Sequence, residues 1–161
     1  MTYRLRIRSR LATDRRTLWA HASSMNGVNA ELAPVRMSHP AGAAIVPGVS
    51  LGRPLFRSVV SLWGLVPLDV HELGLVDVRP DEGFHESSRS VLERRWIHRR
   101  TLADAPDGVE ITDELEFEPR ILGFLVARIV AGTFERRHAC LRRLFPSRDA
   151  GPPRVEWLPS A

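Results

Sequence analysis

The segment from residue 92 to residue 117 constrains the fold most, because it has the pattern of a two-stranded hairpin with one charge on its apolar side. Apolar and polar residues alternate over residues 109–117, as they do in a strand with one buried face. Asp113 falls on the apolar side of that alternation. A carboxylate that faces a core costs several kcal/mol unless it is paired or solvated in a cavity. The sequence therefore predicts a buried partner for Asp113 or a polar cavity around it.

The hairpin also predicts which side chains share the inner face with Asp113. Its turn falls in residues 103–108, and a register that sets Leu102 opposite Val109 places His98 opposite Asp113. The outer face then carries arginines and glutamates that pair across the two strands. The inner face carries a polar and aromatic set: Trp96, His98, Arg100 and Asp113.

Composition limits the chemistry that this chain can perform. Its 23 basic residues are all arginine and its one tyrosine is Tyr3, so lysine Schiff-base chemistry is excluded and a tyrosine acid nearly so. The single cysteine, Cys140, cannot form an internal disulfide or a cysteine-rich zinc site, which favours the cytoplasm. The histidines lack metal-binding spacing, and no signal peptide or membrane-spanning segment is evident. We expect no metal and no cofactor.

The first strand, residues 3–11, has a face made only of arginine: Arg4, Arg6, Arg8 and Arg10. Such a face could bind the phosphates of a nucleic acid. Alternatively, it could lie beside the glutamates of residues 110–116 on a neighbouring strand, with both sets of charges in water. We favour the second interpretation and expect no nucleic-acid partner.

The remaining pattern predicts two short helices, more strands and one long helix. Asp14 is a suitable N-cap for a helix over residues 15–23, and a second helix ends near Leu32. Apolar residues at three- and four-residue spacing predict a helix over residues 121–145 with one face along a sheet. A loop rich in Gly and Pro, residues 40–54, is predicted as an ordinary connector, with a gate over a cavity as the alternative. Strands are predicted over residues 35–39, 55–63, 68–78 and 83–91.

In this order the elements predict an α+β fold, in which a curved antiparallel sheet of about seven strands wraps around the C-terminal helix. Four motifs follow one another in the second half of the chain. They are Phe84-His-Glu86, Trp96-Ile-His98, the segment from Ile111-Thr-Asp113 through Phe117-Glu-Pro119, and a helix with Phe134, Arg137, Leu141 and Phe145 at F-x-x-R-x-x-x-L-x-x-x-F spacing. With these motifs, residues 3–145 resemble the START-like or SRPBCC superfamily, in particular its bacterial polyketide cyclase/dehydrase-like ligand-binding subgroup. The sequence departs from that subgroup at Ser90-Val-Leu92, where Gly-Pro-Phe is usual.

The resemblance implies a helix-grip fold in one domain, residues 1–145, followed by an irregular tail over residues 146–161. It also implies a cavity between the sheet and the last helix for a small hydrophobic ligand that is lipid, aromatic or polyketide-like. The sequence leaves the oligomeric state open, with a homodimer as one option, and predicts no stable membrane insertion. We expect the ligand to contact Trp63, Trp96, His98, Arg100, Asp113, Ile129, Thr133 and Arg137.

The role of the polar inner face remains open at this point. Asp113 could pair with His98, or with Arg137 from the helix, and only specify the packing. The cluster could instead orient a ligand. It could also serve an enzyme of the polyketide cyclase or aromatase kind, with His98 and Asp113 as acid and base and Arg100 or Arg137 next to an enolate.

We favour packing or ligand binding over catalysis, because chemistry cannot be inferred from a fold. A structural or regulatory module that binds a protein partner is a further alternative. Trp19 and Trp63 are predicted to pack in the core first and to form a pocket wall second.

Overall fold

A computed structural model describes residues 1–46 and 54–159 of the protein. Residues 47–53, which hold much of the predicted connector or gate, lie outside the described residues. None of the described helices is long and apolar enough to cross a membrane. The described elements, in chain order, are β1 (Tyr3–Leu11), α1 (Arg15–Ala22), α2 (Met25–Leu32), β2 (Val35–Met37), β3 (Pro54–Leu62), β4 (Val66–Arg79), β5 (Gly83–Ser90), β6 (Glu93–Ala105), β7 (Gly108–Pro119), α3 (Gly123–Leu144) and β8 (Glu156–Trp157).

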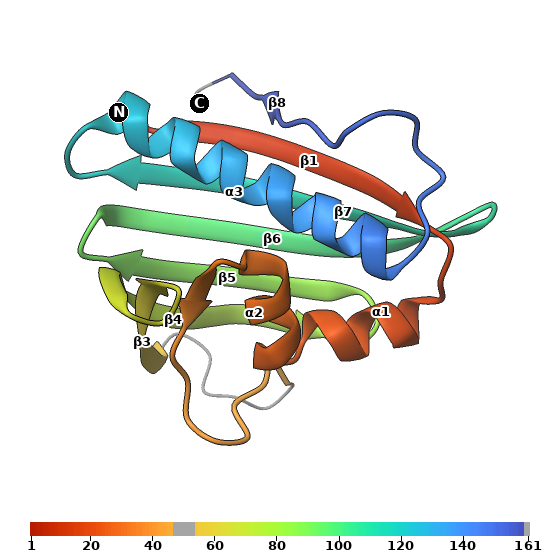
Figure 1. Ribbon diagram of the computed structural model, residues 1–161, viewed down its shortest axis with the longest axis horizontal. Helices are drawn as coiled ribbons and strands as arrows, with labels where there is room; N and C mark the ends of the chain where they lie inside the picture. The colour runs from red at the N-terminus through yellow and green to blue at the C-terminus, as the bar shows by residue number, and fades with distance from the viewer. Residues whose placement is uncertain (47–53, 160–161) are drawn as a thin grey trace.

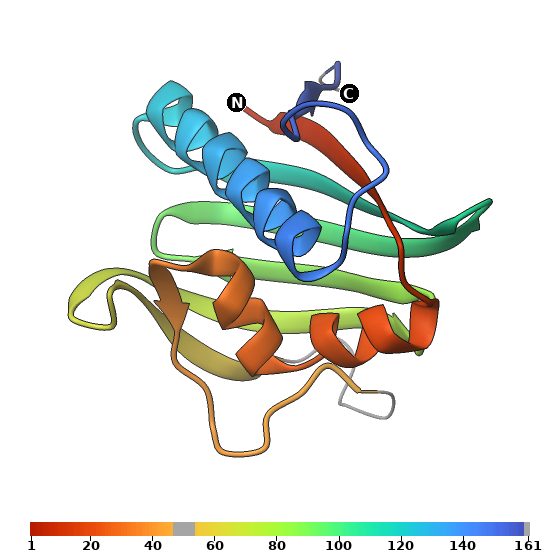
Figure 2. The ribbon, with the colours of Figure 1, turned by 45° about the vertical axis from the view of Figure 1, so that its right-hand side comes forward.

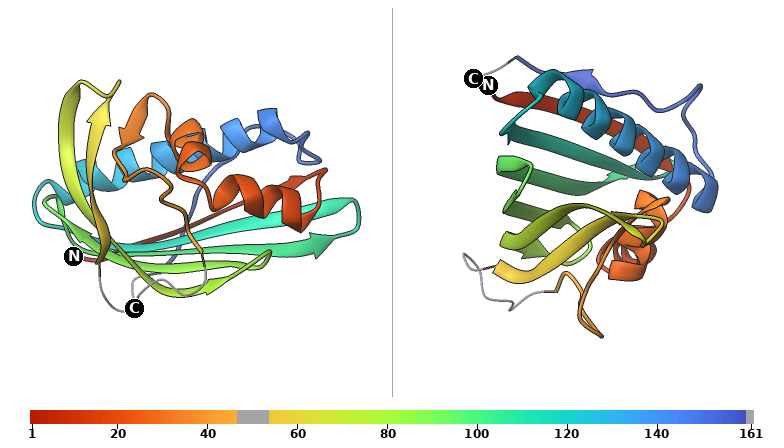
Figure 3. Two further views of the ribbon diagram at one scale, coloured as in Figure 1. Left: turned by 90° about the horizontal axis from the view of Figure 1, so that it is seen from below. Right: turned by 60° about the vertical axis from the view of Figure 1, so that its left-hand side comes forward.

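The strands form one antiparallel sheet in the order β2-β3-β4-β5-β6-β7-β1-β8. Helix α3 lies along β1, β7 and β6, while α1 and α2 lie over β5 and β4 (Figures 1 and 2). All three helices are on the same face of the sheet, which curves around them (Figure 3). The predicted α+β fold, with a curved antiparallel sheet around a long C-terminal helix, is therefore confirmed.

Local sequence explains where the helices begin and end. The side chain of Asp14 accepts a hydrogen bond from the Thr17 N–H at 2.9 Å and caps α1, as predicted. Ser24 caps α2 in the same way through the Gly27 N–H, also at 2.9 Å. The last turn of α3 carries two arginines, which suit the negative end of the helix dipole.

The apolar core has three parts, and polar side chains occupy the space between two of them. One cluster joins β1 and β7 to α3 and includes Phe117 and Phe134. A smaller one, with Leu75 of β4 and Phe84 of β5, packs against Trp19 of α1. The His98 ring lies between these two clusters, 5.1 Å from the Phe84 ring and 5.2 Å from the Phe134 ring. Trp19 packs in the core, as predicted.

The β6–β7 hairpin has the predicted inner face but not the predicted register. The strands continue to a two-residue turn, so that Leu102 pairs with Ile111 and Arg100 pairs with Asp113. The predicted pairing of His98 with Asp113 across the strands is wrong by two residues. A loop of residues 103–108 was expected, but Ala105 pairs directly with Gly108 and lengthens both strands. Because side chains alternate with a period of two, this shift leaves every side chain on its predicted face.

The arginine face of β1 is paired with glutamates, as predicted. Arg4 lies opposite Glu116 and Arg6 lies opposite Glu114 in the β1–β7 ladder. The Arg6 Nε donates to the Glu114 Oε1 at 2.7 Å. The charges of this face therefore have intramolecular partners.

Candidate functional site

A cavity of about 230 Å³ lies between the sheet and helices α2 and α3. Most of its wall is apolar and comes from both helices and from β2, β3 and β4. Its polar side chains come from the middle of the sheet and from α3. These polar residues are Asp69, His71, Glu86, Glu93, His98, Thr133 and Arg137.

Asp113 lies behind the cavity wall and is completely buried. Its Oδ1 accepts hydrogen bonds from Arg100 Nε at 2.8 Å and from His98 Nε2 at 2.9 Å. Its Oδ2 accepts from Arg100 Nη2 at 2.8 Å and from His138 Nε2 at 3.1 Å. Burial alone would raise the pKa of Asp113, but the Arg100 guanidinium and His98 hold it well below its usual value. The predicted buried partner of this carboxylate is therefore present.

Glu31, from α2, is a second buried carboxylate that the sequence analysis missed. Arg100 binds it with two nitrogens at 2.9 and 3.0 Å, and Arg137 does so at 2.9 and 3.1 Å. Burial would raise the pKa of Glu31, but the two guanidinium groups lower it well below its usual value. Of the two partners considered for Asp113, His98 is therefore present, whereas Arg137 binds Glu31 instead. Helix α2 places Glu31 within reach of Arg137, and Arg100 already occupies both oxygens of Asp113.

A third carboxylate, Glu86 of β5, connects this network to the cavity. Its Oε1 accepts from His71 Nε2 at 2.8 Å, and its Oε2 lies 3.4 Å from His98 Nδ1. Burial would raise the pKa of Glu86, but hydrogen bonds from His71 and His98 lower it well below its usual value. Burial would likewise lower the pKa of His71, but the bond to Glu86 raises it. A continuous chain of polar contacts therefore runs from His71 in the cavity wall to Asp113.

His138 supports Asp113 from the other side. Arg142 Nε donates to Ser9 Oγ at 2.7 Å, and Ser9 Oγ lies 2.9 Å from His138 Nδ1. Because Ser9 accepts from Arg142, its hydroxyl proton is available to Nδ1, and Nε2 then carries the proton donated to Asp113. Burial lowers the pKa of His138, in agreement with this neutral form.

The buried carboxylates of the network outnumber its buried guanidinium groups. Three buried carboxylates, Glu31, Glu86 and Asp113, face two buried guanidinium groups, Arg100 and Arg137. A positive charge on a histidine beside Glu86 balances them, and both His71 and His98 contact this carboxylate. His71, whose pKa is raised by Glu86, can supply that charge at the cavity wall.

The cavity also has an acidic corner near the β5–β6 turn. Burial raises the pKa of Glu93, whose carboxylate is hydrogen-bonded to the Ser90 hydroxyl. Asp69 lies beside it, and its Oδ1 accepts from the backbone N–H groups of Val91 at 3.0 Å and of Leu92 at 3.2 Å. This corner offers carboxylate oxygens to the cavity.

The structure brings most of the predicted site residues together. Arg100 and Asp113 are buried behind the wall and do not line the cavity. Trp63 is elsewhere: it is 64% exposed in the β3–β4 turn, so its predicted place in the core or the pocket wall is wrong. It has a φ of 53° and precedes Gly64 in a tight turn that holds its side chain outward. The predicted residues that do line the cavity are Trp96, His98, Ile129, Thr133 and Arg137.

The sequence contains a signal for two of the site residues that were not predicted, Glu86 and His71, but none for Glu31. Glu86 follows Phe84 with a period of two, so that a carboxylate lies in phase with an apolar residue, as at Asp113. His71 is in phase with Leu73 and Leu75 in the same way. No such signal marks Glu31, because a helix of eight residues with mixed composition does not define which face is buried.

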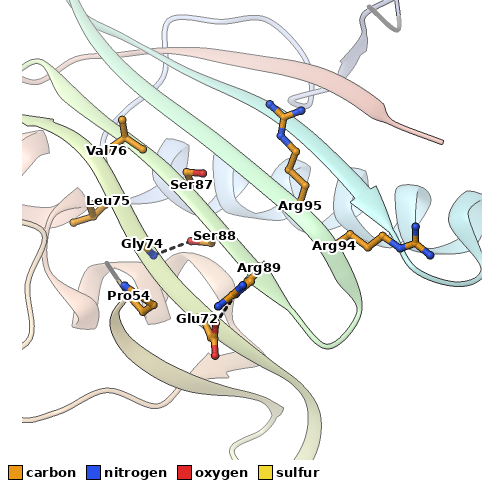
Figure 4. Close-up of a pocket in the computed structure, with 10 residues that line it drawn as sticks. All are labelled: Pro54, Glu72, Gly74, Leu75, Val76, Ser87, Ser88, Arg89, Arg94 and Arg95. Carbon is orange, nitrogen blue, oxygen red and sulfur yellow. Dashed lines mark hydrogen bonds and ion pairs between the residues drawn. The ribbon is translucent and has the colours of Figure 1, made fainter. Parts of the chain in front are cut away.

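A second hollow, of about 430 Å³, lies on the face of the sheet that is turned away from the helices (Figure 4). Glu72 and Arg89 face each other in it, with Arg89 Nε 2.7 Å from Glu72 Oε2. Arg57 occupies the other oxygen of Glu72 at 2.8 Å. Because these charges satisfy one another at the surface, we interpret the hollow as a solvated strand face.

An antiparallel sheet that curves around a long C-terminal helix is the helix-grip fold, and solved structures share it. Protein CV1439 from Chromobacterium violaceum is 12% identical, with 88% of this chain and 96% of that chain covered and a TM-score of 0.66. A START superfamily protein from Mycobacterium smegmatis is 10% identical over 88% of this chain and 96% of that chain, with a TM-score of 0.63. DynU16, a protein in the dynemicin biosynthetic locus, is 15% identical over 88% of this chain and 46% of that chain, with a TM-score of 0.59.

A comparison of the sequence with protein families identifies the family of this chain. The family described as Domain of unknown function (DUF8410) matches residues 9–145, and the chain belongs to this family. No curated protein matches the sequence significantly.

The buried carboxylates predict how stability depends on pH. The pKa values of Glu31, Glu86 and Asp113 are lower in the folded protein than the values of about 4 in an unfolded chain. Their contribution to the free energy of unfolding is therefore present above about pH 4 and is lost as the pH falls further. We expect Glu31→Gln to reduce the pH slope of this loss by about one proton, or about 1.4 kcal/mol per pH unit. Urea unfolding between pH 2.5 and pH 6 measures the slope, and an equal slope in both proteins would contradict this assignment.

Proposed function

We propose that the protein binds a small, largely apolar molecule in the cavity between the sheet and α3. The observation that carries this proposal is an apolar cavity of about 230 Å³ with a few polar groups gathered along its sheet side. Cavities that bind small molecules have this composition. The volume favours a compact aromatic or short acyl ligand.

The polar groups of the cavity favour a ligand with a hydrogen-bond donor, such as a hydroxyl or amine. Arg137 lines the cavity, but two of its nitrogens donate to Glu31, and its guanidinium carbon lies 4.7 Å from the centre of the Phe134 ring. Arg100 is buried behind the wall and occupied by two carboxylates. Glu93 and Asp69 line the cavity as well and add acceptor oxygens to its polar side.

Native mass spectrometry of the freshly purified protein, together with analysis of its organic extract, tests the proposal. We expect a stoichiometric mass adduct that disappears after extraction and that contains an apolar body with a hydroxyl or amine group. A bare mass, combined with no binding of the apolar dye N-phenyl-1-naphthylamine, would overturn it.

Proton transfer to or from a bound ligand is a second candidate function, and the contact between His71 and Glu86 favours it. His71 lines the cavity and uses Nε2 for Glu86, while its Nδ1 has no hydrogen-bond partner among the described residues. A carboxylate that orients a histidine in this way is typical of an acid/base pair. The proposed pair of His98 and Asp113 is less suitable, because both ring nitrogens of His98 face carboxylates.

This candidate predicts exchange of acidic C–H protons in a bound ketone. We expect the protein to accelerate deuterium exchange at the carbon next to the carbonyl of 2-tetralone in D₂O, as followed by NMR. His71→Asn should remove the acceleration and leave dye binding intact. Equal exchange with the wild-type protein and with His71→Asn would exclude His71 as the group that transfers the proton.

A further inference from the structure

The cavity reaches the surface between two apolar edges at one end of the molecule. One edge is the β3–β4 turn with the start of β4, and the other is the first two turns of α3, which lie at the same end (Figures 1 and 2). Leu68 and Ile129 both line the cavity and are exposed, so these edges continue its wall. We call the following residues the apolar lips: Trp63, Leu65, Leu68, Phe124, Leu125 and Ile129.

The apolar lips are strongly exposed to solvent. Their side chains are between 46% and 82% exposed. The turn that carries Trp63 is held in place by a hydrogen bond of 2.9 Å from its backbone N–H to the Pro34 carbonyl. Exposed apolar groups that form a patch around a cavity indicate a surface that binds a protein, a membrane or a ligand.

The exposed charged residues within the segments that carry the apolar lips are arginines. Residues 58–68 and 120–134 contain no Asp or Glu. Arg36, Arg120 and Arg128 are exposed, and none of them has an ion-pair partner among the described residues. The Arg128 guanidinium carbon lies 5.8 Å from the centre of the Phe124 ring, and Arg36 Cδ lies beside Gly64 in the turn. A second copy of the chain would bring like charges together across a two-fold axis, whereas an anionic surface complements them.

We propose that the apolar lips dock on an anionic membrane surface and open the cavity toward it. Exposed Trp, Phe and Leu side chains enter the boundary between headgroups and acyl chains, and adjacent arginines attract anionic headgroups. A ligand dissolved in the bilayer can then enter the cavity without crossing water. This last step rests on the proposed ligand binding, while the docking itself does not.

Co-sedimentation with large unilamellar vesicles tests the docking. We expect the protein to bind vesicles of phosphatidylcholine with 30% phosphatidylglycerol, to bind vesicles of pure phosphatidylcholine at least fivefold more weakly, and to be released by high salt. Leu125→Ser should weaken binding at least fivefold, whereas Leu144→Ser should not, although both leucines lie on α3 and are 52% exposed. Arg128→Gln should weaken binding more than Arg143→Gln, which is the matched change near the other end of the same helix.

Several results would overturn the proposal. One is the absence of binding to the anionic vesicles, and another is an equal effect of Leu125→Ser and Leu144→Ser. A dimer in light scattering that Leu125→Ser dissociates, without any vesicle binding, would assign the apolar lips to a second copy of the chain. Thr133→Phe, which fills part of the cavity, should weaken dye binding at least tenfold and leave vesicle binding unchanged, so failure of docking and failure of ligand binding can be told apart.

Discussion

Replacing Asp113 with alanine is expected to lower the free energy of unfolding by about 3–5 kcal/mol, because it leaves a buried guanidinium without one of its two carboxylates. Arg100 would retain Glu31, but Glu31 is already shared with Arg137. His98 and His138 would lose the same acceptor. Urea denaturation at pH 7, with the unfolding slope compared between variants, measures the loss.

The adjacent residue provides a matched control for this change. Glu114 also binds an arginine, Arg6, but its side chain is 39% exposed, so Glu114→Ala should cost less than about 1 kcal/mol. Adding Arg100→Met to Asp113→Ala should recover part of the loss, since Glu31 still has Arg137. If Asp113→Ala costs no more than Glu114→Ala, the network does not stabilise the fold.

The faces of the strands could be predicted from the sequence, whereas the partners within the network could not. Asp113 and His98 were assigned to the inner face by their alternation with apolar residues, and the assignment holds although the register differs by two residues. The period of a strand defines its face for each residue separately. It cannot distinguish registers that differ by an even number of residues, because these leave each side chain on the same face.

Long-range partners depend on how separate elements are placed relative to one another. Glu31 and Arg100 are 69 residues apart in sequence. They meet because α2 lies against α3 and over the sheet. Hydrophobicity alone also misplaces Trp63. It predicts burial, but the turn at Trp63-Gly64 directs the side chain outward. A large apolar residue in a turn can therefore belong to a binding surface instead of the core.

Thr133→Phe is expected to weaken binding of N-phenyl-1-naphthylamine by about 10- to 100-fold, because overfilling a site costs about 1–3 kcal/mol and each 1.4 kcal/mol is tenfold in affinity. Thr133 lines the cavity next to Ile129 and Arg137. Its hydroxyl donates to the Ile129 carbonyl at 2.8 Å, so its removal leaves no buried donor without a partner. A fluorescence titration measures the affinity. Arg136→Phe, which places the same ring on the solvent side of α3, should bind the dye like the wild-type protein.

Thr133→Phe also distinguishes a ligand-binding cavity from a simple packing defect. If the void is only a defect, a larger side chain that fills it removes no ligand and adds apolar contacts, so the free energy of unfolding should rise and dye binding should not change. If the void accommodates a ligand, the ring competes with the dye for one volume, and affinity falls whether or not stability rises. Unaltered dye affinity in Thr133→Phe would place the dye elsewhere on the protein and would remove the cavity from the proposed function.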